Sequence, residues 1–191
     1  MKNNQYYYLI IITILLTTTS INAQVYLGIS GGASLINQND IEFWQQRYEV
    51  EGVSTTRKLF IGYQFKYLGF ELGNRFLGNV SEQTDLYVLN ADKKGWDFTG
   101  IGRYSFGKLS AFVKAGVVFL SHRNYYTLIY ENHVNTYLNK VKSQDVLLGV
   151  GSDFSVTNFL ALRLEYEGIM LQESNNYHSI TLGTLFKIRH K

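Results

Sequence analysis

An alternation of apolar with polar or very small residues recurs along most of this chain, and it restricts the available folds more than any other feature. In one example, Leu162 and Leu164 alternate with Arg163 and Glu165. Because successive side chains of a strand point to opposite faces, each such segment predicts a strand with two chemically different faces. Eight strands are expected, in residues 27–34, 58–66, 68–76, 96–106, 109–119, 145–154, 160–167 and 179–188. Three apolar residues break the pattern inside these strands: Ile101, Phe112 and Val118.

The composition favours a sheet without free edges. The 191 residues include no proline, although average usage predicts about 10. Proline cannot donate a hydrogen bond to a strand ladder, so a chain made of central strands excludes it, and a closed barrel has only central strands. The absence of cysteine excludes disulfides and metal-thiolate sites. The formal charge of +3 is small and its basic residues are scattered, so no nucleic-acid partner is expected.

The first 23 residues resemble a secretion signal. Lys2 precedes an apolar run over residues 6–16, and small or polar residues lead to Ala23. The run is about half as long as the roughly 20 residues that a membrane-spanning helix needs. We therefore expect cleavage after Ala23, which divides the chain into a signal peptide, residues 1–23, and a barrel domain, residues 24–191.

Charge placement distinguishes a membrane barrel from a soluble one. Five charged residues lie near the middles of their expected strands, where most neighbours on the same face are Gly, Ser or Thr: Glu71, Arg103, Lys114, Arg163 and Glu165. Small neighbours suit a crowded lumen, with the apolar faces turned outward to lipid. These five charges are then expected to pair across a narrow bore and close it. The alternative, a soluble ligand-binding barrel, would expose this glycine-rich face to water.

The connections between the expected strands alternate in length. Three are short turns, near Lys66, Gly107 and Thr157, and four are longer and polar, covering residues 35–56, 77–94, 121–144 and 170–177. Bacterial outer-membrane barrels show this asymmetry, with short periplasmic turns and long external loops. The fold expected is an all-β, eight-stranded antiparallel transmembrane barrel with both ends in the periplasm.

This pattern resembles the small outer-membrane barrels of the outer-membrane protein A and X type, including opacity-like surface proteins. The most specific match is the last strand, where apolar residues stand at the positions that the family uses as its assembly signal: Ile180, Leu182, Phe186 and Ile188. The sequence departs from the family by ending the strand in Ile188, where Phe is common, and by adding residues 189–191. The resemblance implies a place among outer-membrane lipid and lipopolysaccharide, and a partnership with the barrel-assembly machinery.

Candidates for catalysis and metal binding are weak. His178 and Ser179 are adjacent, so their side chains are expected on opposite faces of a strand, where a base cannot reach its nucleophile. His122, His133 and His190 are far apart and lack the spacing of metal ligands. We expect no catalytic residue, no metal and no cofactor.

The link over residues 123–142 is rich in Tyr and Asn, with strand-like residues on both sides of a tip formed by Tyr130, Glu131, Asn132 and His133. Such residues suit a recognition surface, and a plain shielding loop is the alternative. We expect an outer-membrane protein with a structural or surface-recognition role in adhesion, host contact or envelope integrity, and with a host or envelope protein as partner. A narrow ion or solute channel and a lipid A-modifying enzyme remain alternatives.

Overall fold

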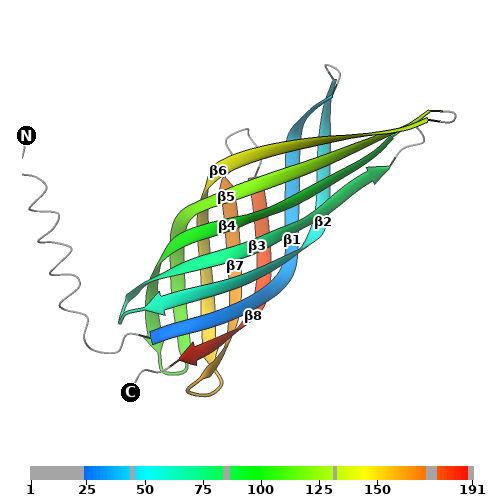
Figure 1. The fold of residues 1–191 in the computed structure, drawn as a ribbon. Helices are drawn as coiled ribbons and strands as arrows, with labels where there is room; N and C mark the ends of the chain where they lie inside the picture. The colour runs from blue at the N-terminus through cyan, green and yellow to red at the C-terminus, as the bar shows by residue number, and fades with distance from the viewer. Residues whose placement is uncertain (1–23, 44–45, 84–86, 131–132, 171–175, 189–191) are drawn as a thin grey trace, which may run out of the picture.

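The computed structural model describes residues 24–43, 46–83, 87–130, 133–170 and 176–188. They form one closed antiparallel barrel of eight strands, in which each strand pairs with its sequence neighbours and the last pairs with the first (Figure 1). The strands are β1 (Gln24–Phe43), β2 (Gln46–Gln64), β3 (Leu68–Gln83), β4 (Tyr87–Phe106), β5 (Leu109–Tyr130), β6 (His133–Ser155), β7 (Leu160–Met170) and β8 (Asn176–Ile188). The predicted fold class is confirmed. No helix among the described residues is long and apolar enough to cross a membrane.

Closure is continuous between the first and last strands. β1 pairs with β8 from Val25 opposite Ile188 to Asn37 opposite Asn176. The signal peptide expected at residues 1–23 and the tail at 189–191 lie outside the described residues.

The two faces of each strand are inverted relative to a soluble protein. In β7, Leu162 and Leu164 are 48% and 49% exposed, whereas Arg163 and Glu165 between them are each 1% exposed. A membrane barrel has its apolar residues outside in this way. The soluble-barrel alternative is therefore wrong.

The three apolar exceptions point into the lumen, as their positions in the alternation predict. Ile101, Phe112 and Val118 are buried in the lumen with 2%, 3% and 0% exposure. They fill space that the bore of an eight-stranded barrel leaves for side chains. The alternation thus predicted which way each residue points, although the chemistry of the inward face is mixed.

The long links are shorter than the sequence predicted, and this expectation was wrong. The structure continues the strands into them, so that only residues 44–45, 84–86, 131–132 and 171–175 separate the paired strands on that side. Outside the membrane both faces of a hairpin meet water, so the alternation that marks a strand is lost there. The short turns are as predicted: residues 65–67, 107–108 and 156–159. Gly107 adopts a φ of 65° in the tightest of them, a conformation that favours glycine.

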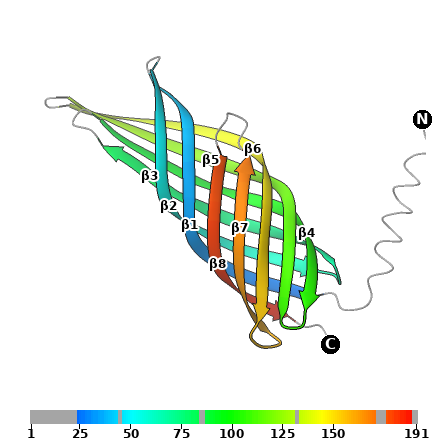
Figure 2. The same ribbon diagram turned by 180° about the vertical axis from the view of Figure 1, so that it is seen from behind.

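The barrel divides into two leaves on the side of the long hairpins (Figures 1 and 2). β2 pairs with β3 only as far as Arg57 opposite Phe76. Beyond that point β3 follows β4 alone, through a register shift between Phe76 and Asn79. Gly78 lies in this bulge with a φ of 97°, which only glycine adopts at little cost. On the other side, β6 and β7 part after Val146 opposite Met170.

Candidate functional site

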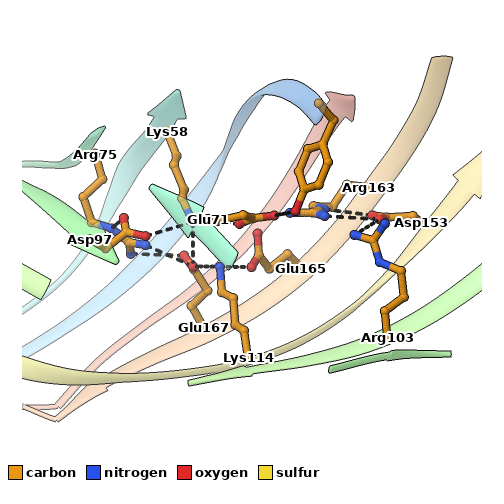
Figure 3. A network of polar contacts seen from close by, with 11 residues as sticks. Lys58, Glu71, Arg75, Asp97, Arg103, Lys114, Asp153, Arg163, Glu165 and Glu167 are labelled. Carbon is orange, nitrogen blue, oxygen red and sulfur yellow. Dashed lines mark hydrogen bonds and ion pairs between the residues drawn. The ribbon is translucent and has the colours of Figure 1, made fainter. Parts of the chain in front are cut away.

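Ten charged side chains from six strands meet in the middle of the lumen (Figure 3). All five charges singled out from the sequence point inward and belong to this group. The structure brings five more to the same place, which sequence reasoning missed. The complete lumen network is Lys58, Glu71, Arg75, Asp97, Arg103, Lys114, Asp153, Arg163, Glu165 and Glu167. Five are cationic and five anionic, so the network is formally neutral, whereas the five predicted residues alone would carry an excess positive charge.

One half of the network is centred on Arg163. Its guanidinium donates from Nε to Asp153 Oδ1 at 2.8 Å, and from Nη1 to Glu71. Glu71 also accepts a hydrogen bond from the Tyr26 hydroxyl at 2.7 Å. Arg103 forms an ion pair with Asp153 at 2.8 Å. Charge-assisted hydrogen bonds hold Arg163 in place, and an ion pair holds Arg103 beside the same Asp153 carboxylate.

The other half is centred on Glu167. Arg75 donates to both of its oxygens, at 3.0 and 3.1 Å, and from Nε to Asp97 at 2.8 Å. Lys114 forms ion pairs with Glu167 and Glu165. Lys58 joins the two halves, with its ammonium 3.3 Å from Glu167, 3.5 Å from Asp97 and 3.8 Å from Glu71. The network is therefore a single connected layer across the bore.

Apolar side chains lie on both sides of this layer. On the side of the short turns, Tyr26, Phe60, Ala161 and Leu185 form one buried cluster. A second buried cluster lies toward the long hairpins: Leu77, Val118, Leu120, Leu147, Ile169 and Tyr177. The Arg163 guanidinium also lies over the Phe112 and Phe60 rings, at 4.5 and 5.0 Å from their centroids. Buried side chains therefore enclose the charges on both sides within the bore.

The sequence held a signal for each missed residue. Lys58, Arg75, Asp97, Asp153 and Glu167 all stand at inward parity in the predicted strands. Their common height could not be read from the sequence, because heights on different strands depend on the stagger of the barrel.

The remaining predicted residues lie elsewhere. Four apolar residues of β8 face outward, as Ile180, Leu182, Phe186 and Ile188 are 59%, 68%, 50% and 53% exposed; their role as an assembly signal stays a prediction. Tyr130 and His133 are paired at the ends of β5 and β6. Glu131 and Asn132, at the tip between them, lie outside the described residues.

The geometry also bears on the catalytic and metal candidates. Ser179 points into the lumen and is 3% exposed, whereas His178 points outward to the Tyr166 hydroxyl, 2.8 Å from its Nδ1. The two side chains are thus on opposite sides of the wall. In the part of the chain that the structure describes, no three His, Cys, Asp or Glu side chains are arranged to hold a metal ion.

Comparison with known proteins agrees with this architecture. Residues 21–185 match a protein family described as the OmpA-like transmembrane domain. The chain belongs to this family. As an OmpA-like domain it is a bacterial outer-membrane protein, and its exposed apolar belt faces lipid. A comparison with curated protein sequences finds no match.

Solved structures share the barrel of this OmpA-like domain. The attachment invasion locus protein Ail of Yersinia pestis, in complex with the heparin analogue sucrose octasulfate, has a TM-score of 0.61 and 13% identity over 88% of this chain and 100% of Ail. A major outer membrane protein from Thermus thermophilus has a TM-score of 0.58 and 11% identity, over 87% and 99% of the two chains. Neisserial surface protein A has a TM-score of 0.57 and 11% identity, also over 87% and 99%. At these identities the likeness concerns the fold.

The filled lumen of this OmpA-like domain leads to a prediction about its ion conductance. Purified protein in planar bilayers should show little steady conductance, because the connected charges and the two apolar clusters occupy the bore. Single-channel recording checks this, with a 16-stranded porin as the open control. A large and steady conductance from pure protein would mean that the network lines an open channel.

Proposed function

We propose that this barrel is a structural and surface-recognition protein of the outer membrane, which binds a host or envelope protein through its external sheet. The observation that carries the proposal is the unpaired edge of β6. In the described part of the chain, β7 pairs with β6 only from Val146 to Ser155. Residues 133–145 of β6 pair with β5 on one side and have no described strand on the other.

An unpaired edge is a template for an extended segment of another protein. Such a segment would add as a further strand, with backbone hydrogen bonds supplying affinity and alternate side chains supplying specificity. Lys140 and Lys142 lie on this edge strand, and edge lysines disfavour indiscriminate pairing between copies. The fitting partner is therefore a protein with an exposed extended segment. The membrane part of the barrel would serve as the rigid anchor.

Shortening the β5–β6 hairpin tests this proposal. His122 and Val141 are opposite each other, so replacing residues 123–140 by Asn-Gly closes the hairpin with a two-residue turn and removes residues 133–140 of the unpaired edge. We expect the variant to fold and to lose most adhesion of displaying cells to epithelial monolayers or to plates coated with extracellular matrix. The matched control replaces residues 39–49 between the paired Gln38 and Val50 of β1 and β2, and should adhere normally.

Orientation is checked with an epitope tag at Asn132, which should be labelled on intact cells. Equal adhesion by the shortened variant and the full chain would contradict the proposal. Labelling only after lysis would contradict the external placement of the hairpin.

A further inference from the structure

The outward face of the barrel carries a groove with a volume of about 810 Å³ and mainly apolar walls. Its floor follows residues that are direct partners on successive strands. Gly100 of β4 is opposite Ala115, which is opposite Leu148, then Gly168, then His178 of β8. The groove thus crosses five strands along the hydrogen-bonding direction.

Three outward glycines of this groove are not required by the packing of the barrel. A Cβ added at Gly100, Gly102 or Gly168 would meet its nearest atom at 3.8, 3.5 and 3.6 Å, which is ordinary contact. In the lumen, by contrast, a Cβ at Gly73 would lie 2.6 Å from Asp97. Glycine weakens a strand, and in a strand interior it often marks the close approach of a ligand. The outward glycines keep open a depression that the fold alone does not need.

Polar groups gather at one end of the groove. His178 and Tyr166 both line it, and they form a hydrogen bond of 2.8 Å on the outward face. They lie near the β7–β8 link, on the external side of the membrane. The opposite end of the groove, at Leu68, adjoins a short periplasmic turn.

The dimensions fit one lipid chain in the outer leaflet. Four interstrand spacings separate β4 from β8, which gives a length of about 19 Å. Because the strands are tilted by about 35–45°, the two ends of the groove differ in height by about 12 Å along the membrane normal. This is close to half of a hydrocarbon core of about 30 Å. Lipid is the neighbour that this face always has, and an unfilled groove would forfeit dispersion contacts along its whole floor.

We propose that the groove binds an acyl chain of lipopolysaccharide, with the phosphorylated head of the lipid beside His178 and Tyr166. The imidazole and the hydroxyl supply hydrogen bonds to the phosphate oxygens at the membrane surface. The site is thus a fixed lipid position on one side of the barrel, separate from the external edge of β6.

Photo-crosslinking tests this site. The protein is reconstituted in phosphatidylethanolamine vesicles with a trace of phosphatidic acid that carries a diazirine on its acyl chain, and labelled residues are mapped by mass spectrometry. Labels should concentrate on Val113, Leu148 and Met170. Lipopolysaccharide should lower the labelling several-fold, whereas additional phosphatidylethanolamine should not. A diacylglycerol probe with the same chain should label less, because it lacks the phosphate.

Filling the groove provides the variants. Gly100→Leu and Gly168→Leu should each lower the labelling several-fold. The matched control is Gly31→Leu, since Gly31 is an outward glycine of β1 outside the groove, where a Cβ has its nearest neighbour at 3.7 Å. Uniform labelling around the wild-type barrel would overturn the proposal even if a variant failed to fold. Equal labelling by both probes would overturn the placement of the head, and crosslinks to a second protein chain would show that the groove binds protein.

Discussion

Glu71→Ala should lower the free energy of unfolding by about 3–5 kcal/mol, the usual cost of breaking a buried ion pair by removing one partner. Glu71 is 0% exposed, and it accepts hydrogen bonds from Arg163 and Tyr26. Its loss leaves Arg163 and Arg103 to share the single carboxylate of Asp153. Urea titration in detergent micelles, followed by tryptophan fluorescence, measures the change. The variant should also raise the planar-bilayer conductance, because Lys58 and Arg163 lose a fixed contact.

Two further variants separate charge from lost volume. Glu165→Gln should cost under about 1 kcal/mol, because Lys114 keeps its ion pair with Glu167. Glu71→Ala combined with Arg163→Met restores the balance of charge and leaves Asp153 paired with Arg103. The double variant should therefore be more stable than Glu71→Ala alone. A less stable double variant would mean that packing, and not charge, explains the loss.

Leu164→Arg should cost about 2–4 kcal/mol, the usual penalty for an arginine on the lipid face near the middle of the membrane. Leu164 lies halfway along β7 and is 49% exposed, between the inward Arg163 and Glu165. An arginine is thus favourable at position 163, which faces the lumen, and unfavourable at position 164, which faces lipid. The same urea titration, in lipid vesicles, measures the effect.

The control for this substitution is Val156→Arg. Val156 is 45% exposed in the turn between β6 and β7, where an arginine reaches water, so its stability should change little. Equal effects at Leu164 and Val156 would contradict the assignment of the apolar face to lipid.

The sequence predicted the barrel well where two environments meet. Between Leu160 and Glu167, lipid on one side and the lumen on the other impose different residues, so alternation marks the strand and its faces. Above the membrane that difference is absent. The chain from His122 to Tyr130 still pairs with β6, but its sequence carries no period of two. The strand ends were therefore predicted too early.

The sequence predicted that charged residues pair in the lumen, but it identified only five of the ten residues in the network. The alternation along the strands predicted that Arg163 and Glu71 point into the lumen. The narrow lumen led to the expectation that they form an ion pair. The pairing of Arg75 with Glu167, however, spans 92 residues of sequence and depends on the shear of the closed barrel. No local pattern encodes that distance. The division into two leaves likewise depends on the bulge at Gly78, which a single glycine among 17 does not reveal.

The length of the external part of β6 determines how far from the membrane a bound partner would lie. Residues 133–145 continue as paired strand beyond Val146, and thirteen residues at about 3.3 Å each make an arm of about 43 Å. With a strand tilt of about 35–45°, its tip stands roughly 30 Å above the last membrane-embedded pair, which is about the diameter of a small domain. The paired hairpin would therefore separate a protein bound at its tip from the lipid head groups.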